Sequence, residues 1–385
     1  MADSNTQGSL WGSEVYDRQT AGAWPTSWYA VPPRKLWAWG ENGSGELGLG
    51  DITARNSPVQ VGSSLDWKTV ATGQGHTAVI KTDGTLWTFG SNGQSQLGDS
   101  TAVSKSTPAQ VGALTNWKYV STVSYHNLAI KTDGTLWAWG YNTAGQLGDT
   151  TYNTNNSPAQ LGSLTTWRNT AAGGYHSVAI KTDNTLWTWG ANSYSQLGNG
   201  TSGTWTKVLS PTQIGALTNW STVSAGNSHT VATKTNGTLW AWGRNNSGQL
   251  GDGTGTNRSS PVQIGALTTW LTVACGQYYS LAIKTDGTLW AWGRNGYGQL
   301  GNGTSNDTYA PVQIGTLTNW SSMGGAAEHT LALKTDGTLW AWGKGLNGRL
   351  GLESGTSFSS PKQVGTLTTW LTTAAGGYHS IAISS

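Results

Sequence analysis

The amino-acid sequence predicts an all-β fold, a seven-bladed β-propeller whose blades are four-stranded antiparallel sheets. First, the pentapeptide Leu-Trp-x-Trp-Gly recurs at a spacing of about fifty residues, which indicates a repeat architecture. Second, each repeat holds four short segments with strand character, separated by turns. Third, the two ends of the chain supply complementary halves of one repeat, which closes a ring. The pentapeptides begin at Leu36, Leu86, Leu136, Leu186, Leu239, Leu289 and Leu339, with Phe89 replacing the second tryptophan in the second copy.

The first two strands of a repeat are illustrated by the unit that begins at Trp167. Residues 167–174 are small and apolar enough for a strand in a crowded place. Residues 176–181 alternate as a half-buried second strand does. A turn follows at residues 182–185, and in most other copies it reads Thr-Asp-Gly-Thr, in which the Asp-Gly pair favours a two-residue hairpin. The sequence therefore predicts that an antiparallel hairpin joins the second and third strands.

The pentapeptide is the predicted third strand. Because side chains alternate across a strand, Trp187 and Trp189 point to the same face, so each blade offers an aromatic face to a neighbour. A glycine-rich connection of the form Asn-x-x-Gly-Gln-Leu-Gly-Asp leads to the fourth strand, for which residues 157–162 are the example. The proline near its start suits the outer edge of a blade, where one backbone donor is dispensable.

The two ends of the chain predict how the ring closes. Seven first strands match the seven pentapeptides, but the chain opens on a third strand and ends on a second strand. Residues 370–383 must therefore supply the inner strands of a blade whose outer strands lie within residues 36–62. We expect an N-terminal aromatic-containing arm at residues 1–34 and the propeller at residues 35–385. The first strands begin at Trp67, Trp117, Trp167, Trp220, Trp270, Trp320 and Trp370.

Composition argues against several classes of function. Charged residues make up 10% of the chain, the formal net charge is +3 and no polybasic run occurs, so we expect no nucleic-acid binding. Cys275 is the only cysteine, which leaves neither a disulfide framework nor a cysteine zinc site. We also expect no secretory signal peptide and no membrane span. The compartment stays open, with a virion as one option.

The motifs of the repeat, read in order, resemble those of a known family. The consensus of the units runs through Gly-x-x-His-[Ser/Thr]-x-Ala-[Ile/Leu], Thr-Asp-Gly, Leu-Trp-x-Trp-Gly and Asn-x-x-Gly-Gln-Leu-Gly. This series is similar to the regulator-of-chromosome-condensation repeats, which form seven-bladed propellers, and the resemblance covers about residues 35 to 385. The near-identical units and the low-charge surface, rich in Thr, Asn and Gly, resemble the bacterial and phage versions of these repeats.

The resemblance also implies an activity. The founding member of the family is a guanine-nucleotide exchange factor and chromatin binder, and a similar activity is expected to show as irregularity: a wedge in one blade, acidic contacts and a basic tail. Here the only change of spacing is three extra residues between Trp187 and Trp240, within residues 199–210. The resemblance therefore leaves exchange or chromatin-type regulation as an alternative.

Three repeated polar positions are candidate sites, and we interpret each as structural. The histidines share one repeat position and are spread around the ring, which favours hydrogen bonding over a metal site or a pH switch. Lysine and aspartate at the hairpin tips are expected to neutralise one another rather than to recognise an acidic partner. Asparagines after the pentapeptide are expected to cap turns rather than to bind calcium. The histidines are His76, His126, His176, His229, His329 and His379, with Tyr279 in the remaining unit.

The sequence contains no recognisable catalytic triad, phosphate loop or paired carboxylates, so it predicts no enzyme, no cofactor and no metal site. Specificity is instead expected where the repeat is interrupted, in the arm and in the insertion. Aromatic residues in such segments are the kind that anchor interfaces. The predicted partner-binding residues are Trp11, Tyr16, Trp24, Trp28, Tyr29 and Trp205.

The predicted function is that of a non-catalytic propeller, a structural or interaction module in a larger assembly such as a phage virion appendage or decoration. Protein partners are expected to bind through the N-terminal arm and the propeller loops. One alternative is multivalent glycan binding, in which exposed aromatic rings between blades stack on sugars. The other alternative is guanine-nucleotide exchange or chromatin-type regulation.

Overall fold

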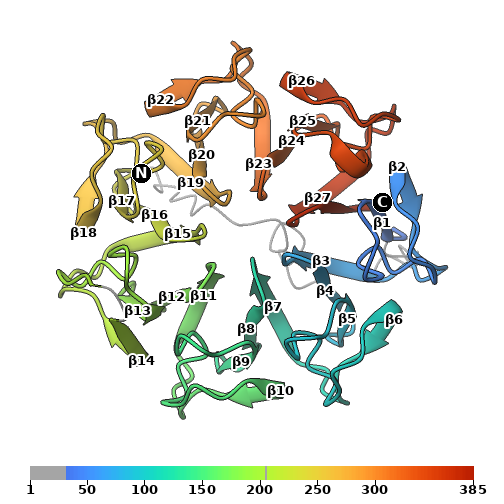
Figure 1. The fold of residues 1–385 in the computed structure, drawn as a ribbon, viewed down its shortest axis with the longest axis horizontal. Helices are drawn as coiled ribbons and strands as arrows, with labels where there is room; N and C mark the ends of the chain where they lie inside the picture. The colour runs from blue at the N-terminus through green and yellow to red at the C-terminus, as the bar shows by residue number, and fades with distance from the viewer. Residues whose placement is uncertain (1–31, 204–205) are drawn as a thin grey trace, which may run out of the picture.

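The computed structural model describes residues 32–203 and 206–385, which form a ring of seven four-stranded antiparallel blades (Figure 1). The predicted fold class is confirmed. Within these two ranges, no helix is long and apolar enough to cross a membrane. A single turn of 3-10 helix, η1 (Leu346–Gly348), lies in one of the loops between strands.

The strands fall into four positions counted outward from the axis. The innermost strands are β3 (Trp67–Thr72), β7 (Trp117–Thr122), β11 (Trp167–Ala172), β15 (Trp220–Ala225), β19 (Trp270–Cys275), β23 (Trp320–Gly325) and β27 (Trp370–Ala375). The second strands are β4 (His76–Lys81), β8 (His126–Lys131), β12 (His176–Lys181), β16 (His229–Lys234), β20 (Tyr279–Lys284), β24 (His329–Lys334) and β28 (His379–Ser384). The third strands are β1 (Lys35–Gly40), β5 (Leu86–Gly90), β9 (Leu136–Gly140), β13 (Leu186–Ala191), β17 (Leu239–Gly243), β21 (Leu289–Gly293) and β25 (Leu339–Gly343). The outer strands are β2 (Arg55–Gln60), β6 (Lys105–Gln110), β10 (Asn155–Gln160), β14 (Lys207–Gln213), β18 (Arg258–Gln263), β22 (Thr308–Gln313) and β26 (Phe358–Gln363).

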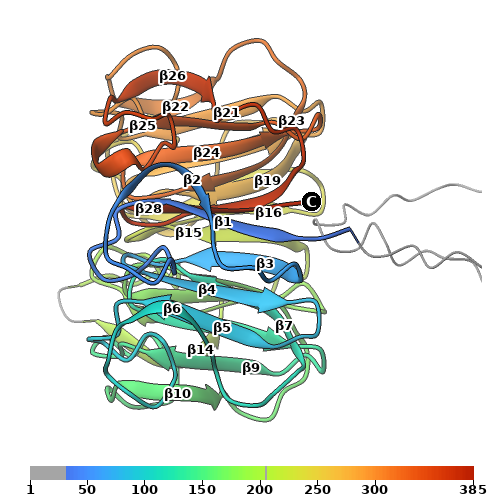
Figure 2. The same cartoon turned by 90° about the vertical axis from the view of Figure 1, so that its right-hand side faces the viewer.

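The turns of the blades fall on two opposite faces of the ring, which Figure 2 shows from the side. We call the side with the Thr-Asp-Gly turns the hairpin face. The side with the Gly-x-x-His turns and the asparagine loops is the loop face. Lys35 at the start of β1 pairs with Ser384 at the end of β28, so the propeller begins and ends on the hairpin face.

Adjacent blades pack an aromatic face against an aliphatic one, as the alternation predicts. Trp167 and Trp189 of one blade are buried against Leu128 and Ile130 of the preceding blade. The Trp189 indole also donates a hydrogen bond across the boundary to the Gln146 carbonyl, at 2.9 Å. An indole of this kind buries on the order of 200 Å², which contributes up to about 5 kcal/mol. Tryptophan burial therefore contributes strongly to the contact between blades.

The ring closes within one blade, in which the strand order is β2-β1-β28-β27. This is the predicted combination of N-terminal outer strands with C-terminal inner strands. Lys35 to Gly40 pair in continuous register with Ser384 to His379. Across the adjacent boundary, the Trp39 indole donates to the Arg349 carbonyl at 3.0 Å. Closure thus uses the same contacts that join the other blades.

The outer strands are irregular edges. In β10, Asn155 pairs with Gly140 and the next pair is Ala159 with Ala138, so the ladder skips residues on the outer strand. Pro158 lies in that irregularity, where its missing N–H costs no ladder bond. The proline was correctly interpreted from sequence as the mark of an edge strand.

Candidate functional site

The histidines form a ring of hydrogen bonds that crosses every blade boundary. The His76 Nε2 lies 3.0 Å from the Asn127 Oδ1 of the next blade. Tyr279 takes part through its hydroxyl, which lies 2.8 Å from the Thr330 Oγ1. The predicted hydrogen-bonding role of the histidines is confirmed. The other pairs are His126–Ser177, His176–Thr230, His229–Ser280, His329–Ser380 and His379–Thr77.

The hydrogen-bond network determines which nitrogen of each histidine carries the proton. The Ser177 hydroxyl donates to the Gln146 carbonyl at 2.7 Å, so its oxygen must accept from the His126 Nε2–H at 2.9 Å. Burial lowers the pKa of His126 to about 3 and that of His76 to about 4, so both rings are neutral at pH 7. A Cβ at Gly73 would lie 2.4 Å from the His76 Nδ1. That nitrogen therefore faces backbone, with no space for a ligand.

The lysines that end the second strands lie over tryptophan rings. The Lys131 Nζ lies 3.4 Å from the ring centroid of Trp137 and 4.8 Å from that of Trp117. Desolvation lowers the pKa of Lys131, while Asp133 instead accepts hydrogen bonds from the backbone and hydroxyl of Thr135. Lys131 and Asp133 form no direct ion pair with each other, although the charge of Asp133 still acts to raise the pKa of Lys131, so their mutual neutralisation stays a prediction. Cation–π contact with two indoles holds the lysine, and its ammonium is largely covered.

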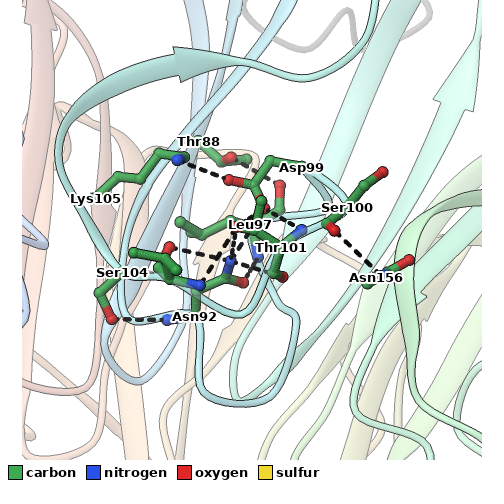
Figure 3. Close-up of polar contacts among 10 residues, drawn as sticks. Thr88, Asn92, Leu97, Asp99, Ser100, Thr101, Ser104, Lys105 and Asn156 are labelled. Carbon is green, nitrogen blue, oxygen red and sulfur yellow. Dashed lines mark hydrogen bonds and ion pairs between the residues drawn. The ribbon is translucent and has the colours of Figure 1, made fainter.

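The asparagine loops are organised by side-chain caps (Figure 3). The Asn92 Oδ1 accepts the Leu97 N–H at 2.9 Å, and its Nδ2 donates to the Thr101 carbonyl at 3.0 Å and to the Asp99 carboxylate at 3.1 Å. Asp99 also forms an ion pair with Lys105 at 3.1 Å. The predicted capping is confirmed, and the carboxylate that calcium would need is already engaged.

Much of the remaining chemical variety lies at three positions of the loop face. They are the residue before the histidine, the residue after the pentapeptide glycine, and the third residue of the asparagine loop. The first set is Gly75, Tyr125, Tyr175, Ser228, Tyr278, Glu328 and Tyr378. The second set is Glu41, Ser91, Tyr141, Ala191, Arg244, Arg294 and Lys344. The third set is Ser44, Gln94, Ala144, Tyr194, Ser247, Tyr297 and Asn347.

Tyrosines and cations from these sets meet along one side of the loop face. We call this group the tyrosine–cation arc. The Arg244 guanidinium carbon lies 4.7 Å from the Tyr194 ring centroid and 5.3 Å from that of Tyr278. Arg294 lies over the same Tyr278 ring at 5.7 Å. The arc consists of Tyr194, Arg244, Tyr278, Arg294, Tyr297 and Lys344, with the Lys344 Nζ 4.2 Å from the Tyr297 ring.

A second group of tyrosines lies elsewhere on the loop face. The rings of Tyr125 and Tyr175 each contact the Tyr141 ring edge-on, with 6.3 Å between centroids. Desolvation is the main cause that raises the pKa of Tyr125. Tyr175 is 40% exposed, so part of this tyrosine trio faces solvent. The loop face therefore carries a cationic sector and a neutral aromatic sector.

The central channel offers little chemistry. A cavity of about 520 Å³ lies along the axis and is lined mostly by threonine, serine, alanine, valine and glycine. Lys118 and Arg168 add positive charge towards the hairpin face, where the Arg168 guanidinium donates to the Trp220 and Ser221 carbonyls at 3.1 Å. Burial raises the pKa of Cys275 to about 12, so this thiol is no nucleophile. Among the described residues, no group of histidine, cysteine and carboxylate side chains is arranged to hold a metal.

Comparison with known proteins assigns the repeats to a family. A family model described as the regulator of chromosome condensation (RCC1) repeat matches seven times, consecutively and almost without gaps. The chain belongs to the RCC1 repeat family. A second RCC1 repeat model also matches within the propeller. The matched residues of the first model are 35–80, 83–130, 133–180, 183–233, 236–283, 286–333 and 336–383.

Solved structures share the whole RCC1-type ring. Yeast RCC1 (Prp20) bound to Kap60 aligns with a TM-score of 0.81 and 20% identity over 92% of this chain and 89% of that one. Prp20p from Saccharomyces cerevisiae aligns with a TM-score of 0.80 and 20% identity over 92% of both chains. Human WBSCR16 aligns with a TM-score of 0.81 and 22% identity over 91% of this chain and 98% of that one. These likenesses show the fold alone, and no curated protein sequence matches the chain.

The predicted partner-binding residues lie outside the described residues. These are Trp11, Tyr16, Trp24, Trp28, Tyr29 and Trp205. The flanks of both segments are placed. The Arg34 N–H bonds the Leu65 carbonyl at 2.7 Å on the hairpin face. On the loop face, the Thr206 N–H bonds the Gly203 carbonyl at 3.1 Å.

Reading the sequence one repeat at a time missed the tyrosine–cation arc. Arg244 and Tyr278 come from different RCC1 repeats and meet only when neighbouring blades pack. An alignment of the seven copies against one another would have found the signal. Columns that hold histidine, lysine or asparagine are nearly constant, whereas the column of Arg244 and Arg294 also holds Glu41, Tyr141 and Lys344.

Proposed function

We propose that this RCC1-repeat propeller is a non-catalytic interaction module that binds a protein partner through its loop face and belongs to a larger assembly, such as a phage virion appendage or decoration. One observation carries the proposal. Tyrosines, cations and acids at three variable positions gather on the loop face, opposite the hairpin face at which β1 begins with Lys35. The loop face is therefore available for recognition, on the side of the ring opposite the start of β1.

The chemistry of the repeats supports a binding role over catalysis. The histidines are neutral and engaged across blade boundaries, the lysines lie over indoles and the asparagines cap loops. Each of these groups is committed to the fold, so none is free to act as an acid, base or nucleophile. Variable polar side chains on a rigid scaffold are instead what recognition surfaces require.

Structural relatives support a protein as the ligand. One solved structure of yeast RCC1 (Prp20) holds Kap60, and another study of Prp20p describes its binding to Gsp1p and histones. Those partners belong to those proteins. The shared feature that we transfer is the use of an RCC1-type propeller to bind other proteins.

The proposal is tested by co-purification from the native source with two variants. One lacks residues 1–31, and the other carries Tyr278→Ser and Arg294→Ser on the loop face. We expect the deletion to remove the chain from the assembly and the loop-face variant to lose the partner, while thermal unfolding shows an intact propeller in both. Retained assembly after the deletion would refute the role of the N-terminal segment, and an unchanged set of co-purifying proteins would refute the loop face.

Glycan binding is the second candidate, and the tyrosine trio is the observation that favours it. Tyr175 is 40% exposed beside Tyr141, which offers an aromatic surface of the kind that stacks on sugars. Hits on a glycan array that disappear in Tyr175→Ser would establish this alternative.

Guanine-nucleotide exchange is the alternative that family membership suggests. It predicts accelerated nucleotide release from a small GTPase, and a release assay with the purified propeller decides it.

A further inference from the structure

We propose that the tyrosine–cation arc binds an acidic peptide segment of the partner, with Arg244 and Arg294 as the principal carboxylate-binding residues. This inference rests on the proposed function of the loop face as a protein-binding surface. It goes further by naming the residues and the chemistry of the ligand.

The two arginines carry charge that the described part of the protein does not neutralise. Two other arginines on the blades are paired with an aspartate. Arg258 lies 2.6 Å from Asp252, and Arg55 lies 2.6 Å from Asp51. Neither Arg244 nor Arg294 forms an ion pair with a carboxylate of the described residues. Lys344, in contrast, is paired with Glu328 at 2.7 Å. The two arginines are therefore the members of the arc with charge available for a ligand.

The geometry holds both guanidinium groups ready for a planar anion. They flank the same Tyr278 ring, at 5.3 Å and 5.7 Å from its centroid. Arg244 is oriented further by a 2.8 Å hydrogen bond from its Nε to the Asn246 Oδ1, and its terminal nitrogens form no hydrogen bond with the described residues. A guanidinium fixed in this way presents a fork that matches a carboxylate, and less conformational entropy is lost on binding.

The spacing of the arc fits an extended ligand. Arg244, Arg294 and Lys344 occupy the same repeat position in three successive blades, so they form a curved row around the channel mouth. Asn227 supports the middle of the row, because its Nδ2 donates to the Tyr278 hydroxyl at 3.3 Å. A chain with several carboxylates can contact successive members of the row. Acidic motifs of proteins are commonly recognised by arginine clusters of this kind.

A peptide is favoured over an acidic polysaccharide by the use of the aromatic rings. A sugar stacks its apolar C–H face on the flat face of a tyrosine ring. In the arc, cations lie over the rings of Tyr194, Tyr278 and Tyr297. One face of each of these rings is therefore covered by a cation, so the arc is primarily a site for negative charge. The tyrosine trio, in which rings contact rings, is the separate place where a sugar would stack.

The test measures binding of a fluorescein-labelled peptide of alternating Glu and Ser to the full chain by fluorescence anisotropy. The variant is R244Q/R294Q, and the matched control is K68Q/K118Q, which removes the same charge from the hairpin face. We expect the R244Q/R294Q variant to bind about tenfold or more weakly and the control to bind like the parent protein. Binding of the parent should weaken as salt is raised. Thermal unfolding confirms that both variants are folded.

Tyr278 provides a second variant that leaves the charges in place. Tyr278→Phe keeps the ring between the two arginines, and Tyr278→Ser removes it. We expect the Phe variant to bind like the parent and the Ser variant to bind several-fold more weakly, because the guanidinium groups lose their support.

Three results would overturn the inference. The first is an equal loss of Glu/Ser peptide affinity in R244Q/R294Q and in K68Q/K118Q. The second is binding of a Gln/Ser peptide as tight as that of the Glu/Ser peptide. The third is binding of oligogalacturonate that is tighter than peptide binding and that R244Q/R294Q abolishes. The native co-purification separates this inference from the proposed function. A partner that is lost from Tyr278→Ser/Arg294→Ser but retained by R244Q/R294Q contradicts the acidic-peptide site and leaves the loop face as an interaction surface. Peptide binding without any native partner that depends on the loop face contradicts the proposed function alone.

Discussion

The His379 Nε2 lies 2.9 Å from the Thr77 Oγ1, and this contact joins residues 302 positions apart. Thr77 in turn donates its hydroxyl proton to the Glu46 carbonyl at 3.0 Å, so its oxygen accepts from the histidine. The contact closes a circle of equivalent bonds at the other six blade boundaries. Each bond is buried, so loss of one partner leaves a polar group without water or protein to satisfy it.

Thr77→Val is expected to destabilise the propeller by about 1–3 kcal/mol, because it leaves the His379 N–H and the Glu46 carbonyl unpaired at nearly constant volume. Urea unfolding followed by tryptophan fluorescence measures the change. Thr77→Ser keeps the hydroxyl and serves as the control. Equal midpoints for the Val and Ser variants would show that the bond does not stabilise the ring.

Acid is expected to unfold the propeller well above the pH at which its carboxylates titrate. Burial lowers the pKa of His126, His176, His229 and His379 to about 3, whereas a histidine of the unfolded chain takes up its proton near pH 6.5. The unfolded state therefore binds more protons, and stability falls as the pH is lowered from about 6.5 towards 4. The upper limit is about 1.4 kcal/mol per pH unit for each histidine.

Urea midpoints at a series of pH values between 7 and 4 provide the measurement. The hairpin aspartates, whose pKa values are lowered by hydrogen bonds from threonine, lose their contribution only at lower pH. Burial raises the pKa of Glu46, whose protonation stabilises the folded state as the pH falls, so a loss of stability between pH 6 and pH 4.5 reports on the histidines. A flat midpoint over that interval would contradict their neutral, buried state.

Trp139 is expected to tolerate phenylalanine far better than alanine. Phe89 occupies the equivalent position naturally and is fully buried, so the blade boundary accepts the smaller ring. Trp139→Phe loses the 3.1 Å bond to the Gln96 carbonyl, at a cost of about 1 kcal/mol. Trp139→Ala opens a cavity and costs about 3–5 kcal/mol. Guanidinium unfolding distinguishes the two, and similar losses would contradict packing as the main source of stability.

Asn92→Ala is expected to loosen the loop of residues 93–104 without unfolding the blades. The substitution removes the acceptor for the Leu97 N–H and the donors to Asp99 and Thr101, which costs about 2–3 kcal/mol. Hydrogen exchange at the Leu97 amide measures the loosening. Gln94→Ala, at an exposed position of the same loop, is the control and should exchange like the parent.

The sequence predicted the ring because its signals are local and repeated. Alternation in residues 186–190 sets the aromatic face, and Pro158 marks the edge. The Asp-Gly pair marks the hairpin, but its loop runs over residues 82–84 and is one residue longer than predicted, with Gly84 at a positive φ. Ring closure followed from counting strands, since Trp370 and Leu36 begin complementary halves of one blade. Each inference needed only the period of the side chains along a strand and the order of the segments.

Contacts between distant segments were beyond that reasoning. Lys131 lies two residues before Asp133, so mutual neutralisation was expected. Nothing in the sequence indicated that the Lys131 ammonium lies over Trp117 and Trp137, which the fold brings together from two other strands. The arc depends on a similar convergence of Arg244 and Tyr278 from two blades. Local patterns specify which face a side chain occupies, whereas the neighbour across a blade boundary is set by packing.

The shared blade has a consequence for how the protein is made. The Trp37 indole donates to the Ser384 hydroxyl at 3.0 Å, 347 positions later in the chain. During synthesis on a ribosome, β1 and β2 therefore emerge first and must wait for β28 to emerge last, with the inner edge of β1 unpaired in the meantime. The cost of closing so long a loop falls at the end of folding, after the intervening blades have stacked and shortened the gap. An exposed strand edge of that kind invites pairing with other chains, so the nascent propeller is vulnerable to aggregation until β28 has paired with β1.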